Sequence, residues 1–174
     1  KVLQSHYSDA KKVAKFHHEY EITKNLDLAG IIKPYELLKH KNTWVLILED
    51  IQGDSLKTLL ATKKLDLVTF LLIAIKLASN LGELQAHNII HKDIKPANII
   101  VNLTTSQVKL TDFSISSRLS LETPTISHSN LLEGTLAYMS PEQTGRMNRV
   151  LDYRTDFYSL GIVFYEILVG HPPF

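Results

Sequence analysis

One short segment, IIHKDIKPANIIV at residues 89–101, constrains the fold of this chain more than any other. It places five polar groups at fixed spacing between two apolar runs: His91, Lys92, Asp93, Lys95 and Asn98. Buried strands do not usually carry so many polar side chains, because a buried polar group costs free energy unless it is hydrogen-bonded. The segment is therefore either a polar turn between strands or a site where charges are held for chemistry.

The hydrophobic periodicity before this segment predicts helices around a β hairpin. Residues 8–26 have apolar side chains roughly on one helical face, with Asp9 as a candidate N-cap. Residues 30–50 contain two β-like runs on either side of the polar turn KHKN, which is typical of a hairpin. A short helix then starts with Asp54 or Ser55 as its cap.

Two longer helices and a second pair of strands complete the pattern. Residues 65–88 are apolar nearly all round, which indicates a mostly buried helix. The runs NIIVN and QVKLTDF predict two short strands, and residues 114–153 form a long polar connection. Residues 155–170 predict an apolar helix that ends at Gly170. The order predicts an α+β fold with a small β-rich part and a larger helical part.

Composition narrows the function classes. The 174 residues are 44% hydrophobic and 21% charged, as in one soluble globular domain, and the net charge of +1 gives no reason to expect nucleic-acid binding. The absence of cysteine excludes disulfides and permits a reducing compartment. The longest apolar runs, at 67–75 and 160–170, are shorter than a bilayer span, and no signal peptide is visible. We therefore expect a cytoplasmic protein without membrane insertion.

Three side chains are candidate ligands for a divalent cation. Asp93 and Asn98 are five residues apart with Lys95 between them, and Asp112 follows Asp93 by nineteen residues. Carboxylate and amide oxygens are the ligands that Mg²⁺ prefers in proteins. A lysine beside them can neutralise charge on a transferring phosphoryl group.

These segments resemble motifs of the protein kinase family. HKDIKPAN resembles its catalytic loop, and DFS resembles its metal-binding DFG element. GTLAYMSPE at 134–142 resembles the end of its activation segment, and DFYSLG at 156–161 resembles the start of the buried helix that supports the catalytic loop. Four motifs in this order and spacing, over roughly residues 90–165, identify the chain as similar to a eukaryotic-like serine/threonine kinase catalytic domain.

The resemblance implies a role for each polar residue of the loop. Asp93 would accept or orient the proton of the substrate hydroxyl, and Lys95 would contact the γ-phosphate of ATP. Asn98 would act with Asp112 to hold Mg²⁺. His91 is expected to brace the loop and not to act on the substrate.

The resemblance also implies residues that bind ATP near the N-terminus. Lys1, in KVL, looks like the strand lysine of a kinase small lobe, and Glu19 looks like the helix glutamate that pairs with it. Glu21 is the competitor for this pairing. The alternative without function is that Glu19, Glu21 and Lys24 form an ordinary solvated helix face.

LILEDIQGDSL resembles the hinge that joins the two lobes of a kinase. Glu49 and Ile51 would offer backbone groups to adenine, Leu48 would be the gatekeeper, and Asp54 could reach the ribose. On this resemblance, residues 1–50 are a partial small lobe and residues 51–174 a partial large lobe of one kinase domain. The two-lobe fold would be truncated at both ends, because the chain has no glycine-rich loop and stops after the helix at 155–170.

Two residues depart from the family pattern. Lys92 stands where arginine is usual before the catalytic aspartate, and lysine cannot make arginine's forked contact to a phosphorylated activation segment. Ser114 stands where glycine usually follows Asp112 and Phe113, and serine restricts the backbone there. Control by phosphorylation of the activation segment is therefore a weaker expectation than in the family at large.

Phrases such as LEGTLAYMSPEQTGRMNR are similar to the N-terminal kinase module of large bacterial multidomain sensor kinases, which also carry ATPase-like, GAF and histidine kinase modules. The predicted function is transfer of the ATP γ-phosphoryl group to a serine or threonine of a protein substrate in signal transduction, with ATP and Mg²⁺ as cofactors. The expected partners are ATP, the substrate and other domains of a signalling chain. One alternative is a catalytically weak or inactive kinase-like module that binds nucleotide and regulates an attached signalling enzyme. Another is an unrelated α+β binding domain with coincidental motifs.

Overall fold

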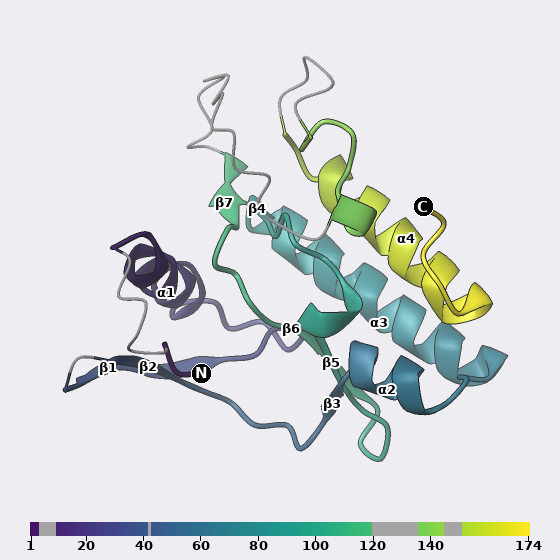
Figure 1. The fold of residues 1–174 in the computed structure, drawn as a ribbon, viewed down its shortest axis with the longest axis horizontal. Helices are drawn as coiled ribbons and strands as arrows, with labels where there is room; N and C mark the ends of the chain where they lie inside the picture. The colour runs from purple at the N-terminus through teal and green to yellow at the C-terminus, as the bar shows by residue number, and fades with distance from the viewer. Residues whose placement is uncertain (4–9, 42, 120–135, 145–150) are drawn as a thin grey trace.

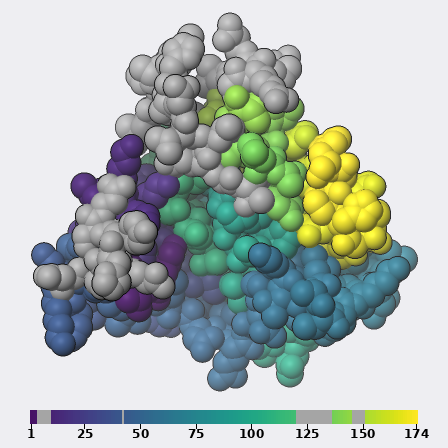
Figure 2. Space-filling view, in the orientation of Figure 1, coloured from purple at the N-terminus to yellow at the C-terminus, as the bar shows by residue number. Residues whose placement is uncertain are grey.

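The computed structural model describes residues 1–3, 10–41, 43–119, 136–144 and 151–174. A smaller part, in which helix α1 lies beside a β hairpin, precedes a larger part in which helices α3 and α4 run side by side (Figure 1). In the space-filling view the smaller part, purple to blue, lies opposite the yellow C-terminal helix, with teal segments between them (Figure 2). The α+β architecture expected from the sequence is confirmed.

The smaller part consists of α1 (Ala10–Thr23) and the antiparallel strands β1 (Pro34–His40) and β2 (Thr43–Leu48). The hairpin and the helix predicted from periodicity are therefore present, while the proposed cap Asp9 lies outside the described residues. Val2 forms an isolated bridge with Val45, which places the N-terminal residues beside β2. This bridge brings Lys1 next to the hairpin.

The larger part contains short strands and the loop they hold. Strands β3 (Asp54–Ser55), β5 (Ile99–Asn102) and β6 (Gln107–Leu110) form one antiparallel sheet, and β4 (Ile89–Ile90) pairs with β7 (Ser117–Arg118). The single-turn helix η2 (Pro96–Asn98) lies between β4 and β5. The polar segment at 91–98 is thus a loop that a strand precedes and another follows.

The N-cap of helix α2 (Leu56–Thr62) is one of the two residues that the sequence predicts as candidates. The Ser55 hydroxyl accepts a hydrogen bond from the backbone N–H of Thr58 at 3.1 Å, so Ser55 is the N-cap in preference to Asp54. Asp66 caps α3 (Leu67–Ala86) in the same way, through the N–H of Thr69. Helix α4 (Arg154–Val169) ends at Gly170, whose φ of 98° requires the left-handed freedom of glycine.

The expectation that α3 is mostly buried is wrong for one of its faces. Leu77, Leu81 and Leu84 are buried, whereas the opposite face exposes large apolar side chains: Leu67, Val68, Leu71, Leu72 and Ile75. A helix that is apolar all round can bury only the face that neighbouring elements cover. Among the described residues, α3 is the one helix long and apolar enough to cross a membrane, and a core helix passes the same test.

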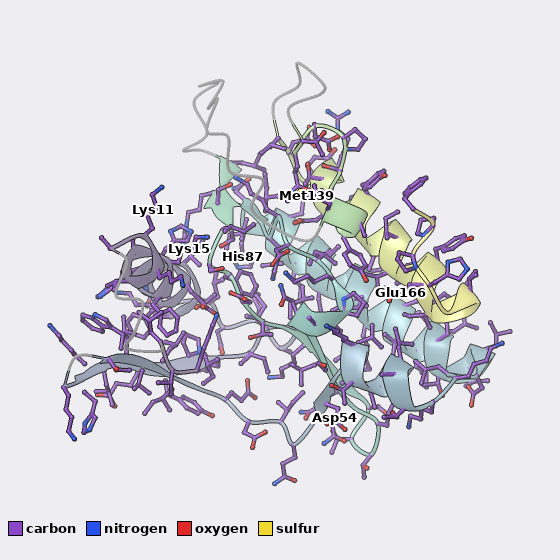
Figure 3. The ribbon with its side chains drawn as sticks, in the orientation of Figure 1. Lys11, Lys15, Asp54, His87, Met139 and Glu166 are labelled. Atoms are coloured by element: carbon purple, nitrogen blue, oxygen red, sulfur yellow. The ribbon has the colours of Figure 1, made fainter. Side chains whose placement is uncertain are left out.

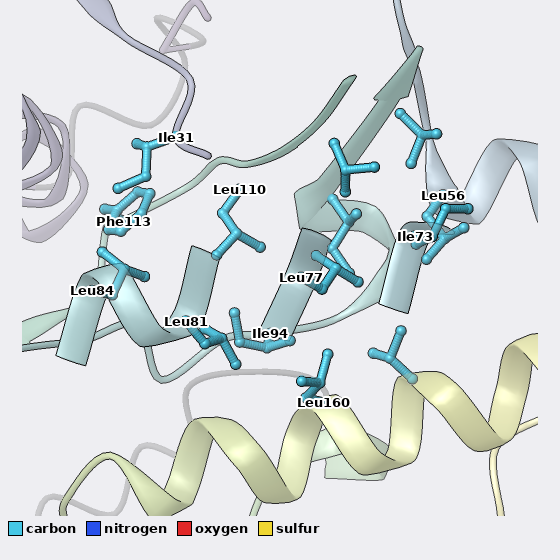
Figure 4. Close-up of a cluster of buried hydrophobic side chains, with 14 of the residues drawn as sticks. Ile31, Leu56, Ile73, Leu77, Leu81, Leu84, Ile94, Leu110, Phe113 and Leu160 are labelled. Carbon is cyan, nitrogen blue, oxygen red and sulfur yellow. The ribbon is translucent and has the colours of Figure 1, made fainter. Parts of the chain in front are cut away.

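The core lies between α3, α4 and the sheet of the larger part. Leu77, Leu110 and Phe113 are almost completely buried, and Leu160 of α4 packs against the same cluster (Figure 4). Ile94, within the polar segment at 91–98, is 1% exposed in this cluster. Burial of Ile94 anchors the loop, so its polar neighbours are held in fixed positions.

Candidate active site

The segment from His91 to Asn98 follows β4 without regular structure until η2 begins. Lys92 has a φ of 68°, in the left-handed region, which reverses the chain immediately before Asp93. Pro96 starts η2, where a missing N–H and a fixed φ are tolerated. The turn and the short helix together place Asp93, Lys95 and Asn98 on one side of the loop.

The Asp93 carboxylate is the centre of the first polar cluster. Lys95 Nζ donates to Asp93 Oδ2 at 2.7 Å, and Asn98 Nδ2 donates to the same oxygen at 2.8 Å and to the Asp93 carbonyl at 2.9 Å. The side chain of Asp93 is 13% exposed and that of Lys95 is 20% exposed. The three residues proposed as catalytic are therefore brought together: the Asp93 and Lys95 side chains stay partly exposed, and Asn98 is buried beside them.

Asp156, at the start of α4, is hydrogen-bonded to the backbone of this loop. Its two carboxylate oxygens accept hydrogen bonds from the backbone N–H groups of His91 at 2.7 Å and Lys92 at 2.8 Å. Burial raises the pKa of Asp156, and the hydrogen bonds from the backbone N–H groups of His91 and Lys92 oppose that shift. The motif at 156–161 thus meets the loop as the resemblance implied.

His91 connects the loop to the strand that carries Asp112. Its Nδ1 accepts the backbone N–H of Asp93 at 3.3 Å, so Nε2 carries the proton and donates to the Thr111 carbonyl at 3.1 Å. The Thr111 N–H in turn donates to the Asn98 carbonyl at 3.0 Å. His91 is fully buried and braces the loop, which is the structural role expected for it.

Lys1, Glu19 and Asp112 form the second polar cluster. Lys1 Nζ lies 2.6 Å from Glu19 Oε2 and 2.9 Å from Asp112 Oδ1, so residues far apart in the sequence meet at one ammonium group. Burial favours the neutral form of Lys1, but the charges of Glu19 and Asp112 outweigh it and raise the lysine's pKa. Burial likewise opposes the charge of Asp112, yet Lys1 and a hydrogen bond from Ser114 lower the pKa of Asp112.

Glu19 is the partner of Lys1, and Glu21 is not. The Glu19 side chain is 3% exposed, and burial raises its pKa against the opposing charge of Lys1. Glu21 instead pairs with Lys24, just beyond the end of α1, at 2.7 Å, and its side chain is exposed. The ordinary solvated face therefore describes Glu21 and Lys24, while Glu19 points into the molecule. The role of the Lys1–Glu19 pair toward ATP stays a prediction.

Among the described contacts, no hydrogen bond occupies the Glu49 carbonyl or the Ile51 N–H, the backbone groups that would meet adenine. The Glu49 N–H donates to the Lys33 carbonyl at 2.8 Å, and the Ile51 carbonyl accepts from Asn102 Nδ2 at 2.8 Å. These bonds do not occupy the Glu49 carbonyl or the Ile51 N–H. Asp54 is exposed on β3, just after the hinge (Figure 3). The contacts proposed for adenine and ribose stay predictions.

Sequence reasoning missed the ion pair that holds the hinge. Lys109 Nζ, on β6, contacts both carboxylate oxygens of Glu49, at 2.7 and 2.8 Å. The Lys33 N–H adds a third bond to this carboxylate at 3.1 Å. An alternating strand such as QVKL indicates which side chains share a face, but the sequence carries no signal that this lysine meets a residue sixty positions earlier.

Two oxygen-bearing side chains fit a magnesium ion bound together with a nucleotide. Because Asn98 Nδ2 is committed to Asp93, its Oδ1 is the atom that can reach a cation, and Asp112 supplies a carboxylate. In the part of the chain that the structure describes, no three His, Asp or Glu side chains cluster as a metal site. That is compatible with Mg²⁺, which is commonly held by one or two protein ligands together with substrate phosphates and water.

The β hairpin, helix α1 and the two polar clusters correspond to the arrangement that the resemblance implies for a protein kinase domain. A family model described as "Protein kinase domain" matches residues 1–174, and the chain belongs to this family. It is 34% identical, over its whole length, to a probable serine/threonine-protein kinase of Clostridium perfringens and 32% identical to the serine/threonine-protein kinase PrkC of Bacillus subtilis. It is 36% identical, over 95% of its length, to an Aurora kinase of Debaryomyces hansenii.

The chain spans 25% of the Clostridium relative and 26% of the Bacillus relative. Of the Debaryomyces relative it spans 39%. The activity of these complete proteins is therefore only proposed for this chain.

Proposed function

We propose that this chain catalyses transfer of the γ-phosphoryl group of ATP to a serine or threonine hydroxyl of a protein. The observation that carries the proposal is the convergence of Lys95 and Asn98 on the Asp93 carboxylate. Asp93 would orient a hydroxyl and accept its proton, while Lys95 would add positive charge beside it. The names of the bacterial relatives favour serine and threonine as acceptors.

The second cluster supplies the nucleotide side of the proposed reaction. Lys1, held by Glu19 and Asp112, would bind phosphate oxygens, and Asn98 and Asp112 would hold Mg²⁺. Bound Mg²⁺ would neutralise charge on the phosphate groups. The Glu49 carbonyl and the Ile51 N–H would bind adenine, and Asp54 would reach the ribose.

Three wider proposals rest on resemblance. Residues 1–50 and 51–174 correspond to two lobes that bind ATP between them. The chain works in the cytoplasm as one module of a larger multidomain sensor kinase. The competing function is a kinase-like module that binds nucleotide and regulates an attached enzyme, and the replacement of the usual arginine and glycine by Lys92 and Ser114 favours it.

Phosphoryl transfer from Mg²⁺-ATP to a generic basic protein, and to the protein itself, tests this function. The assay uses the longest natural chain that contains these residues, with Asp93→Asn and Asp112→Asn as variants. Asp93→Asn keeps the shape but removes the base, so we expect transfer to fall about 100-fold or more with nucleotide binding retained. Asp112→Asn is expected to abolish transfer and to weaken Mg²⁺-dependent nucleotide binding.

Glu36→Gln, on exposed β1, is the matched control and should keep full transfer. Transfer onto serine or threonine that only the two aspartate variants lose establishes the kinase. A folded protein that binds ATP without transferring phosphate would reject the kinase and select the regulatory module.

A further inference from the structure

Gln143 links the end of the activation segment to the catalytic loop. It follows the SPE motif, and its Nε2 donates to the Lys92 carbonyl at 2.7 Å, across 51 residues of sequence. Its Oε1 accepts the Ser140 N–H at 3.1 Å and lies 3.3 Å from the Ser140 hydroxyl. A backbone N–H can only donate, so the Ser140 bond fixes the side-chain amide with Nε2 toward Lys92.

The bonded carbonyl belongs to the peptide group between Lys92 and Asp93. The N–H of that same peptide group donates to His91 Nδ1 at 3.3 Å. One end of the peptide plane is therefore held by His91 and the other end by Gln143. The orientation of this plane decides where the Asp93 side chain begins.

The backbone of Lys92 adopts an unfavourable conformation that hydrogen bonds have to stabilise. Lys92 has a φ of 68°, which costs free energy for a residue with a side chain. Asp156 of α4 accepts a hydrogen bond from the Lys92 N–H, and Gln143 donates one to the Lys92 carbonyl. Together the two bonds fix the backbone N–H and the backbone carbonyl of Lys92, the residue before Asp93.

Residues 140–143 are themselves anchored to α4. Ser140 is fully buried, and its hydroxyl lies 3.4 Å from Thr155 Oγ1. Thr155 also donates to Glu142 Oε1 at 2.9 Å. Met139, directly before Ser140, lies beside the first turns of α4 (Figure 3). A rigid segment is what Gln143 needs in order to orient another loop.

We propose that Gln143 is a positioning residue through which the end of the activation segment sets the orientation of Asp93. The inference rests on the proposed kinase function. The link runs through the backbone of Lys92 and needs no phosphate group, so it couples the two segments where lysine replaces the arginine that would dock a phosphorylated residue. Displacement of residues 140–143 would break the link and turn the Asp93 peptide.

Two substitutions separate this role from a purely local one. Gln143→Glu keeps an oxygen acceptor for Ser140 but replaces the donor to Lys92, and Gln143→Leu removes both bonds. Thr144→Val is the matched control, because the Thr144 hydroxyl bonds only locally in the described contacts, to the Pro141 carbonyl at 2.7 Å. All are made in the longest natural chain that contains these residues.

We expect both Gln143 variants to lower kcat about 10- to 100-fold, as misplacement of a reacting group does, with KM for ATP unchanged. Hydrogen exchange of the backbone around His91–Asp93 should accelerate in both variants and not in Thr144→Val. Wild-type kcat in Gln143→Glu would overturn the inference, since it would show that only the Ser140 contact matters. If the wild-type protein transfers no phosphate, the proposed function fails and exchange alone decides: unchanged exchange overturns the link.

Discussion

At the scale of single residues, two of the six non-glycine residues with positive φ in the described part of the chain lie in the candidate active site. Lys92 has a φ of 68° and Asp112 a φ of 66°, although neither is glycine. Such conformations persist where surrounding bonds over-determine them, and they concentrate at functional sites. Ser114 is absent from the residues with positive φ in the described part of the chain. Serine at that position therefore does not have to adopt the conformation for which glycine was expected.

Glu19→Gln tests the residue that holds Lys1. The substitution keeps the shape of the side chain but removes the charge 2.6 Å from Lys1 Nζ. Lys1 then loses one of its two anchors, and we expect kcat/KM for ATP to fall about 10- to 100-fold because the phosphates are misplaced. Steady-state phosphoryl transfer at varied ATP concentration measures the effect.

Glu21→Gln is the control on the same helix, since Glu21 pairs with Lys24 on the exposed side. Equal losses in the two variants would show that α1 as a whole, and not the Lys1–Glu19 pair, controls activity.

At the scale of elements, the two faces of α3 differ in what they contribute to stability. Leu77 is fully buried in the core, whereas Leu72, on the same helix, is 49% exposed. We expect Leu77→Ala to lower the free energy of unfolding by about 2–5 kcal/mol, because it removes apolar contacts and leaves a cavity. Leu72→Ala should change it by only about 0.5 kcal/mol. Urea unfolding followed by circular dichroism compares them, and a similar cost at both positions would contradict the burial seen here.

Periodicity predicted which elements form, because local spacing decides helix and hairpin. It could not predict which face of α3 is covered, since that depends on neighbours distant in sequence. The polar cluster of the candidate site could be predicted from the sequence, because Asp93, Lys95 and Asn98 lie within six residues of one another. The pairing of Lys1 with Glu19 came from family resemblance, and the contact of Glu49 with Lys109 had no local signal. Tertiary ion pairs of this kind appear only when the fold brings two elements together.

At the scale of the whole molecule, one ion pair ties the hinge to the strand that leads to Asp112. Lys109 on β6 holds the Glu49 carboxylate, and the Lys33 N–H, just before β1, contacts the same group. Both charged side chains are largely covered, at 22% exposed for Glu49 and 12% for Lys109. The pair thus joins the smaller part of the molecule to the sheet beneath the candidate active site.

The substitution Glu49→Gln tests the ion pair with Lys109, and we expect it to lower the stability in a pH-dependent way. Burial alone would raise the pKa of Glu49, but the hydrogen bonds from Lys109 and Lys33 outweigh it and lower the pKa from its ordinary 4.5. A carboxyl with a lowered pKa in the folded state contributes stability above its unfolded pKa and loses it as the pH falls through the folded pKa. We expect the free energy of unfolding of the wild type to exceed that of Glu49→Gln by about 1 kcal/mol at neutral pH. The difference should disappear as acid protonates Glu49.

Urea unfolding of both proteins between neutral pH and acid measures this difference, with Asp27→Asn as the control. Asp27 has a fully exposed side chain 3.7 Å from Lys33, so its substitution should leave the free energy of unfolding close to that of wild type. If the advantage of wild type over Glu49→Gln is the same in acid as at neutral pH, the charge of Glu49 is not what stabilises the hinge. Packing of the side chain would then account for the effect, and the hinge would be coupled to β6 by shape and not by the ion pair.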